Sequence, residues 1–442
     1  MIPDSVWSFM FWLYVAATLV QLALWWWIFR RLGIGYRVLV ISRAQCPVSN
    51  TQHPTSNTQH PTPDTQYPIP NTQYPITIII CARNEAENLR RYLPTVLAQE
   101  YPGDWEVIVV DDASEDETPA VLQFFLEKNP RLRVVRVFEK KHLGKKHALA
   151  QGIAAAKFDN LLLTDADCEP ASPHWLAHMA AALAEKPETE IVLGYGPVCP
   201  PKEQRRVRVN PTPSPSPEKE GRRDIVAAHS TSPLLFGGGV GGGVESWSRF
   251  ETAHTAIQYL SFALTGMPYM GVGRNLAFKK QVYERVGGFA AHLDLPSGDD
   301  DLLVNAAAHS KNVAICLHPE SFVFSESKKT WREWARQKHR HLTAGQRYCR
   351  AHQAILTLVS ASHVLHYFLF AVLLVGSGMV SVVLLFFLRS LSVLFLYWKI
   401  LPKLRESNLL SRVPIYDALL AAYYGALVPL SLIVRRRTRI WK

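Results

Sequence analysis

The chain has 442 residues, of which 48% are hydrophobic and 19% are charged, and the apolar residues concentrate at the two ends around a polar middle. This profile is typical of a membrane-anchored enzyme and excludes a collagen, a disulfide scaffold and a wholly disordered chain. Lysine and arginine number 48 against 37 acidic residues, a net charge of +11, which favours an anionic substrate, an anionic lipid surface or nucleic acid as partner.

The first predicted element is a membrane-spanning helix. Residues 6–28 carry no charge, end in three consecutive tryptophans and precede Arg30, Arg31, Arg37 and Arg43. An aromatic belt followed by basic residues indicates an anchor, which we place at residues 1–32, with the chain after it in the cytoplasm. A cleaved signal peptide is the alternative, but it needs a basic start, and Asp4 is the charged residue there.

Two segments of biased composition interrupt the chain. A linker at 33–74 holds most of a seven-residue repeat that runs from Asn50 to Ile76 with a proline in every unit. The prolines exclude a coiled coil and leave an extended tether or a tolerated insertion. The second segment, at 200–245, is rich in proline, serine and glycine. It predicts a disordered surface loop, and no G-K-[ST] follows its glycines to make a phosphate loop.

Between and beyond these segments, short apolar runs alternate with helical patterns. Strands are predicted at 76–80, 106–110, 134–137 and 161–164, and helices at 85–99, from Pro119 with Thr118 as its cap, and at 147–156. Such alternation predicts an α/β domain with a mostly parallel sheet, at residues 75–345.

Polar residues follow three of these strands: the run from Cys81 to Glu85, the pair Asp111 and Asp112, and Asp165 with Asp167. Ligands of open α/β sheets lie at the carboxyl ends of the strands, so the position predicts a nucleotide site. Asp165 and Asp167 suit Mg²⁺ together with a substrate diphosphate, with an ordinary acidic turn as the alternative. Asp112 could accept from a base or a ribose, or cap a helix.

Two further clusters could carry chemistry. Gly144, Lys145 and Lys146 stand at a helix start, where they would meet a phosphate or form a solvated basic turn. The run from Ser297 to Asp301 ends in three carboxylates, which repel one another unless they share a cation, a lysine or a proton. One of the three could be a general base, and the alternative is a capped helix start.

The residues from Trp331 to Arg350 predict an interfacial helix that leads into the membrane. Its two tryptophans fall on one face, and Gln337 and Arg340 are one turn apart, with Arg340 able to contact a diphosphate. Apolar segments at 355–375, 379–398 and 413–434 then predict two or three spans within a C-terminal region at 346–442. Three spans would leave the basic tail at 435–439 outside, so either one of them is not a full crossing or the positive-inside rule fails here.

Six cysteines are scattered along the chain without a C-x-x-C pair, and no histidines cluster at ligand spacing, so the sequence supports neither a zinc site nor a disulfide framework. They are Cys46, Cys81, Cys168, Cys199, Cys316 and Cys349. This usage predicts a reducing cytoplasm around most of the chain.

Taken in order, the motifs ICARNEAENL, VVDDASED, GKKHAL, TDAD, SGDDDL and QKHRH resemble the membrane-bound family 2 glycosyltransferases of the GT-A fold. The resemblance covers residues 75–345 together with the layout of one membrane helix before and several after. It implies a Rossmann-like domain in the cytoplasm, attached to a multi-pass protein of the cell inner membrane.

The resemblance also implies roles for individual residues. Nucleotide-sugar binding falls to Cys81, Arg83, Asn84, Glu85, Asp112, Lys145, Asp165, Gln337 and Arg340. Within that set, Asp112 would contact the base and Asp165 the ribose. Asp167, with Asp165, would ligate Mg²⁺ or Mn²⁺, and Asp299 would be the catalytic base. Gly298 replaces the glutamate of the family's T-E-D motif, so Asp300 could take over the role of Asp299.

The family's Q-x-x-R-W signature ends here in His341 instead of tryptophan, which weakens a polymer-synthase assignment. The resemblance therefore implies inverting transfer of a hexose from a nucleotide sugar, with a UDP-sugar favoured, to a hydroxyl on a lipid or glycan. A processive polysaccharide synthase is the first alternative, and an inactive membrane protein that binds a sugar nucleotide is the second. Nucleic acid is not an expected partner, because the basic residues cluster beside apolar spans.

Overall fold

The computed structural model describes residues 3–36, 72–139, 144–199, 240–376, 379–427 and 429. Nearly all of the proline-rich repeat, most of the predicted insertion at 200–245 and the basic tail lie outside the described residues.

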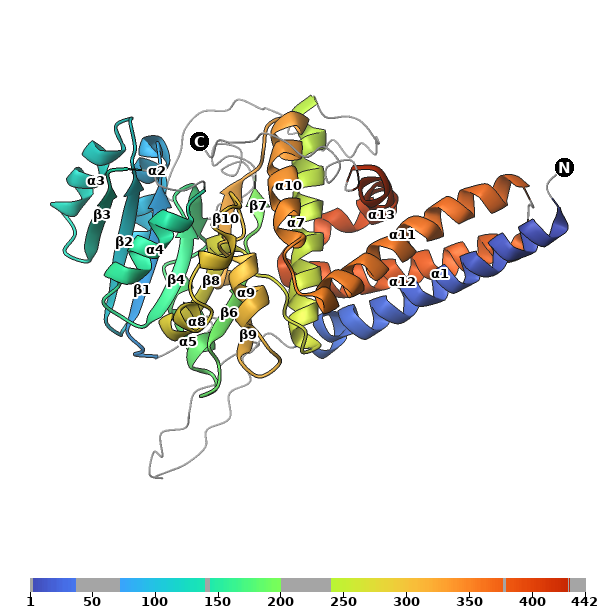
Figure 1. Cartoon of the computed structure of the whole chain (residues 1–442), viewed down its shortest axis with the longest axis horizontal. Coiled ribbons are helices and arrows are strands. Elements are labelled where there is room, and N and C mark those ends of the chain that lie inside the picture. The colour runs from blue at the N-terminus through green and yellow to red at the C-terminus, as the bar shows by residue number, and fades with distance from the viewer. Residues whose placement is uncertain are drawn as a thin grey trace, which may run out of the picture.

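The centre of the molecule is a seven-stranded sheet of strand order β3-β2-β1-β4-β8-β6-β9 (Figure 1). The strands are β1 Ile76–Ala82, β2 Trp105–Asp112, β3 Leu132–Val137, β4 Asn160–Asp165, β6 Ile191–Gly194, β8 Leu276–Lys279 and β9 Val313–Cys316. All neighbouring pairs are parallel except those of β8, which runs antiparallel to β4 and to β6. The predicted mostly parallel sheet is confirmed, and all four predicted strands are present.

Helices cover both faces of this sheet, and alternate residues of each strand enter different cores. Ile78 and Ile80 of β1 lie in one core with α2, α3 and α5, whereas Ile79 lies in the other with α4 and α7. Burial on both faces explains why the strand sequences are continuously apolar rather than alternating. These helices are α2 Ala86–Leu97, α3 Thr118–Leu126, α4 Lys146–Ala155, α5 Trp175–Ala184 and α7 Val240–Leu264.

Two helix starts differ from the predictions. Thr118 is the first residue of α3 and not its cap, because its hydroxyl accepts the backbone N–H of Glu85 at 2.9 Å instead. The hydroxyl therefore joins the start of α3 to the start of α2. Helix α7 begins at Val240, so the last residues of the loop predicted at 200–245 are helical.

A small three-stranded sheet stands beside the large one. Strand β10 (Val323–Glu326) pairs antiparallel with β5 (Cys168–Pro170) and parallel with β7 (Val198–Cys199). Since β4 ends at Asp165 and β5 begins at Cys168, the Asp165–Asp167 turn is held between the two sheets.

Apolar helices form a bundle that projects from the α/β domain, with α7 and α10 (Trp331–Gly345) between the two parts (Figure 1). Helix α1 (Asp4–Arg30, with a π-helical turn to Gly35) packs against α11 (Arg350–Gly376) and α12 (Val380–Ile400). These three helices are long and apolar enough to cross a membrane. The third C-terminal segment differs: its described part is α13 (Val413–Ala422) and a π-helical turn to Leu427.

Candidate active site

The strand register brings the predicted polar strand ends together. Cys81 of β1 is the partner of Asp165 on β4, and Ala82 is the partner of Asp111 on β2. Asp112 ends β2 and is 1% exposed. The carboxylates after β2 and β4 therefore flank the end of β1, as the positional argument predicted.

The loops after β1 and β2 are locked to one another. Asn84 donates its backbone N–H to Ser114 Oγ at 3.0 Å, and its side-chain Oδ1 accepts the N–H of Glu115 at 2.8 Å. Asn84 and Ala113 both have positive φ, 54° and 55°, a conformation that non-glycine residues adopt at some cost and that concentrates at functional sites. Arg83 also reaches this loop through an ion pair with Glu115 of 3.8 Å.

Lys145 connects the two halves of the site. Its Nζ lies 2.8 Å from Asp165 Oδ1 and 3.1 Å from Asp299 Oδ2. Burial disfavours the ammonium, but these two carboxylates outweigh it and hold the pKa of Lys145 well above its usual value. Burial would likewise raise the pKa of Asp165, yet Lys145 holds it below its usual value, with further help from Arg274 and Arg340. Both groups are therefore charged at neutral pH.

Lys145 is positioned by the preceding residue, Gly144, whose backbone lies very close to the backbone of Pro296. Gly144 has a φ of 75°, and a Cβ there would lie 2.3 Å from the carbonyl oxygen of Pro296, so only glycine fits. Lys146, the other predicted phosphate contact, points elsewhere. It is fully buried and donates to the carbonyls of His292 (2.5 Å) and Leu295 (3.1 Å). The two lysines therefore do not form the solvated basic turn that was one prediction. They also cannot both contact a phosphate, because Lys146 is buried against backbone carbonyls.

The three consecutive carboxylates have different partners. Asp300 caps α9 (Asp301–Ala307), and its carboxylate accepts the N–H groups of Gly273 (2.6 Å) and Asp301 (2.9 Å). Burial and the charge of Asp299 raise the pKa of Asp300 to about 6. Burial and Asp300 raise the pKa of Asp301 to about 8, and Asp301 accepts the Tyr348 hydroxyl at 2.8 Å. A helix cap and raised carboxyl pKa values therefore coexist in this run, and Lys145 supplies the cation for Asp299.

Helix α10 lies against the same loop. Ser297 donates its hydroxyl to the carbonyl of Arg340 at 2.8 Å, and the charge of Arg340 helps to lower the pKa of Asp165. Gln337 is half-buried one turn earlier, and His341 is exposed. Trp334 is buried against Trp247 of α7, with ring centroids 6.0 Å apart, so α10 is anchored on the side toward the bundle.

The carboxylates of Asp165 and Asp167 fit a divalent metal. One oxygen of each and the Cys168 sulfur lie within 4.8 Å of one another. Burial and the neighbouring Asp167 raise the pKa of Cys168 well above its usual value, so it remains a thiol that donates to Asp167 Oδ1 at 3.4 Å. Two carboxylates without a thiolate suit Mg²⁺ or Mn²⁺ better than a soft metal.

Two other predicted residues lie close to these carboxylates. Burial and the charges of Asp167 and Asp165 raise the pKa of Glu85, whose carboxylate accepts from Asn88 at 2.5 Å. Burial likewise raises the pKa of Cys81, so its thiol stays protonated beside the charged groups.

Arg274 is a further residue of the site that was not predicted from the sequence. Its guanidinium donates from Nε and Nη2 to the carbonyl of Gly196, at 3.0 and 2.6 Å, and its charge helps to lower the pKa of Asp165. A Cβ on Gly196 would lie 2.1 Å from Arg274 Nε, so this glycine makes room for the arginine. Arg274 lies in a short turn between α7 and the four-residue strand β8, and neither a motif nor a periodic signal marked this turn as part of the site.

The chain is similar to known protein families and to solved structures. The family models for glycosyl transferase family 2 and glycosyl transferase family group 2 match residues 77–233 and 219–423. The mannosyltransferase PcManGT from Pyrobaculum calidifontis, solved with GDP-Man and Mn²⁺, superposes with a TM-score of 0.51 at 18% identity, covering 95% of this chain and 99% of that one. This likeness shows the fold.

Curated relatives match a shorter stretch. The beta-monoglucosyldiacylglycerol synthase of Synechocystis sp. is 35% identical over 21% of this chain and 19% of its own. The poly-beta-1,6-N-acetyl-D-glucosamine synthase of Staphylococcus epidermidis is 33% identical over 21% of each chain. The 4,4'-diaponeurosporenoate glycosyltransferase of Staphylococcus aureus is 37% identical over 21% of this chain and 24% of its own.

The alignments thus span about a fifth of these relatives' length, whereas the two family models together extend from β1 into the helical bundle. The two family models agree with the sheet order, the strand-end carboxylates and the three apolar helices. The chain therefore belongs to the membrane-associated family 2 glycosyltransferases of the GT-A fold.

Proposed function

We propose that this protein transfers a hexose, with inversion, from a nucleotide sugar to a hydroxyl on a lipid or glycan at the cytoplasmic membrane face. The observation that carries the proposal is the contact of Lys145 with both Asp165 and Asp299. One partly buried cation thereby links the strand end expected to bind the donor with the loop expected to activate the acceptor.

For the nucleotide-sugar donor, we assign each residue a role from its place in the site. Asp112 would bind the base and Asp165 the ribose, beside the interlocked loops that carry Arg83, Asn84 and Glu85. Lys145 and Arg340, together with Arg274, would stabilise the negative charge of the departing diphosphate. We expect a UDP-sugar as donor.

Asp165 and Asp167 would hold Mg²⁺ or Mn²⁺. When bound, such an ion neutralises charge on the diphosphate leaving group.

On the acceptor side, Asp299 would act as the general base. The acceptor hydroxyl loses its proton to Asp299 as its oxygen bonds to the anomeric carbon, while the bond from that carbon to the diphosphate oxygen breaks. A single displacement of this kind inverts the anomeric configuration. Both carboxylate oxygens of Asp300 already accept backbone N–H groups, which favours Asp299 over Asp300 for this role.

A lipid acceptor is supported by the position of α10 between the sheet domain and the apolar bundle (Figure 1). Two of the relatives described above carry lipid acceptors in their names, and one is named as a polysaccharide synthase. Product length therefore distinguishes single transfer from processive synthesis.

The proposed organisation keeps the boundaries predicted from the sequence, with an anchor at 1–32, a linker at 33–74, the catalytic domain at 75–345 and a membrane region at 346–442. One span before and two spans after a cytoplasmic domain would return the chain to the cytoplasm, where a basic tail is favoured. We propose the cell inner membrane as the location.

The test is release of nucleoside diphosphate by the detergent-purified protein, measured over a panel of UDP- and GDP-sugars with Mn²⁺ or EDTA and with or without lipid extract. We expect release from one donor that requires both metal and lipid, with the product analysed for anomeric configuration and chain length. Donor binding without release under any condition would contradict the proposal and favour an inactive sugar-nucleotide-binding protein.

A further inference from the structure

Helices α1 and α12 lie side by side in the bundle and run in the same direction. The indole N–H of Trp26 donates to the Ser392 hydroxyl at 2.6 Å, and seven residues further along both helices a Cβ on Gly33 would lie 3.5 Å from Lys399 Cβ. Arg30 lies between Trp26 and Gly33, so its place on α1 is level with the last turn of α12. Two cations, Arg30 and Lys399, therefore stand at the same height on neighbouring helices.

Exposed aromatic rings surround these two cations. Trp26 stacks on Phe395 with ring centroids 6.1 Å apart, and the Lys399 ammonium lies 4.0 Å from the centroid of the Trp398 ring. Arg30 is exposed one helical turn after Trp26, on the same face of α1. We call these five residues the α1–α12 surface, and Figure 1 shows this end of the two helices beside the sheet domain.

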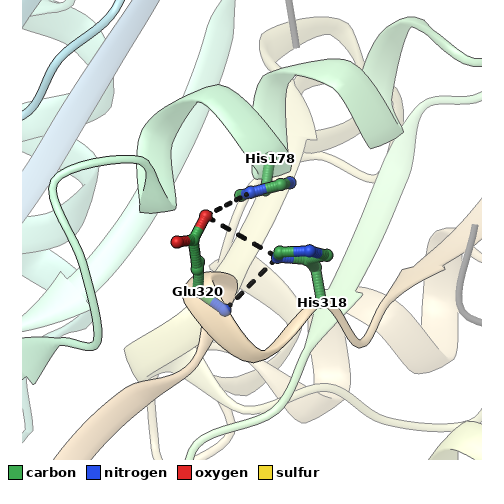
Figure 2. Close-up of side chains that lie close together, drawn as sticks. All are labelled: His178, His318 and Glu320. Atoms are coloured by element: carbon green, nitrogen blue, oxygen red, sulfur yellow. Dashed lines mark hydrogen bonds and ion pairs between the residues drawn. The ribbon is translucent and has the colours of Figure 1, made fainter. Parts of the chain in front are cut away.

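The charges of the α1–α12 surface lack the counter-charge that polar groups elsewhere in the protein have. Figure 2 shows a cluster outside the proposed active site in which His178 Nε2 is 3.1 Å from Glu320 Oε2, and His318 Nδ1 accepts the backbone N–H of Glu320 at 3.3 Å. These groups are partners of one another. Arg30 and Lys399, by contrast, form no ion pair with an acidic residue in the described part of the chain.

We propose that the α1–α12 surface binds an anionic phospholipid, with the phosphate held between Arg30 and Lys399. Guanidinium and ammonium groups donate strong, charge-assisted hydrogen bonds to phosphate. An anionic membrane surface attracts cations that lie at its headgroup level, and tryptophan rings prefer that same level. Cations without a protein counter-charge are left to pair with the lipid.

The exposed side of α12 offers a path for the acyl chains. Leu384, Leu388 and Leu391 are exposed and recur every three to four residues, so they share the face of the helix that leads to the α1–α12 surface. A lipid whose phosphate contacts Arg30 and Lys399 would lay its chains along this face. Such a lipid would hold α1 to α12 beside the sheet domain, and its binding is independent of the transferase reaction.

The test is native mass spectrometry of the full-length, detergent-purified protein, titrated with phosphatidylglycerol or with phosphatidylcholine of the same acyl chains. We expect the wild type to bind phosphatidylglycerol more tightly than phosphatidylcholine. Arg30→Gln and Lys399→Gln should each weaken phosphatidylglycerol binding about fivefold, because each removes one charge that faces the anionic lipid. Lys399→Arg keeps the charge and should bind like the wild type, and phosphatidylcholine binding should not change in any variant.

Lys128→Gln is the matched control. Its ammonium also lies over an exposed ring, 3.7 Å from the centroid of Phe124, but at the end of α3 in the sheet domain, so this variant should keep the wild-type affinity for phosphatidylglycerol.

Thermal unfolding separates loss of binding from loss of folding. Without added phospholipid, Arg30→Gln and Lys399→Gln should unfold at the wild-type temperature. Phosphatidylglycerol should raise the unfolding temperature of the wild type, whereas inorganic phosphate, which has no acyl chains, should not. Equal affinity of the wild type for the two lipids, equal stabilisation by inorganic phosphate, or wild-type binding of phosphatidylglycerol by a folded double variant would overturn the proposal.

Discussion

The consecutive carboxylates Asp299, Asp300 and Asp301 differ because each faces a different part of the protein. Asp299 faces the ammonium of Lys145, and Asp300 caps a helix. Asp301 is buried, accepts the hydroxyl of Tyr348 and has a pKa raised to about 8. A run of like charges that looked costly in the sequence is thus divided into one paired, one capping and one protonated group.

Asp299→Asn and Asp300→Asn together test whether Asp299 is the general base and Asp300 the helix cap. Loss of a general base lowers kcat by about 10²–10⁴-fold, and donor affinity should change little because the base acts on the acceptor. Asp300→Asn should instead lower thermal stability, because a capping carboxylate is lost. Steady-state kinetics and donor binding on both variants check this. Wild-type turnover by Asp299→Asn would eliminate it as the base.

Asp301 makes stability depend on pH. Its pKa rises from 3.8 to about 8 on folding, so the folded state holds a proton that the unfolded state releases. The resulting stabilisation is complete below about pH 4 and disappears as the pH rises through about 8. The unfolding temperature of the wild type should therefore fall between about pH 6 and pH 9, and that of Asp301→Asn should fall less.

Asp294→Asn is the matched control for this titration, because Asp294 is exposed and paired with Arg347 at 2.7 Å. It should reproduce the wild-type pH dependence. An unchanged pH dependence in Asp301→Asn would assign the proton to another group of the site.

Helix α10 is the element that joins the proposed active site to the bundle, and its start is well defined. Thr330 caps it by accepting the N–H of Glu333 at 3.2 Å, and Glu333 Oε2 accepts the N–H of Lys329 at 3.1 Å. This reciprocal pairing resembles a capping box, which satisfies backbone donors at a helix start.

Thr330→Ala should destabilise α10 by about 0.5–2 kcal/mol and raise the KM for the donor, because Gln337 and Arg340 depend on the helix. Thr330→Ser keeps the hydroxyl and should behave as wild type. Thermal unfolding and donor KM measure the two effects. An equal KM in Thr330→Ala and wild type would argue against a donor-binding role for this helix.

The elements that the sequence predicts well are those with long apolar runs. Strands β1 and β2 and the three long apolar helices carry such runs, whereas β6, β8, β9 and β10 have four residues each, too few for a periodic signal. The antiparallel direction of β8 leaves no trace in composition. The strand-end carboxylates follow from the pattern, but the contact of Lys145 with Asp299 and the cluster of His178 with His318 depend on how distant segments pack.

At the scale of the whole molecule, one buried polar network ties the bundle together. Arg389 of α12 donates to Gln21 of α1 at 3.0 and 2.7 Å and forms an ion pair with Asp417 of α13. Tyr367 of α11 donates to Asp417 at 2.7 Å. All four helices therefore meet at one guanidinium and one carboxylate, each at most 2% exposed.

The pair holds the described part of α13 against the long apolar helices, and it predicts a specific pattern of mutant stabilities. Arg389→Met leaves Asp417 buried without its cation and should cost about 3–5 kcal/mol. Adding Asp417→Asn removes the orphaned charge, so the double variant should be more stable than Arg389→Met alone. Lys399→Met, on the same helix, should change little. The free energy of unfolding in detergent is measured for the wild type, Arg389→Met, the double variant and Lys399→Met, and for Asp417→Asn alone to complete the cycle. If the losses of the two single variants simply add in the double variant, the ion pair does not hold α13 in place, and apolar contacts do.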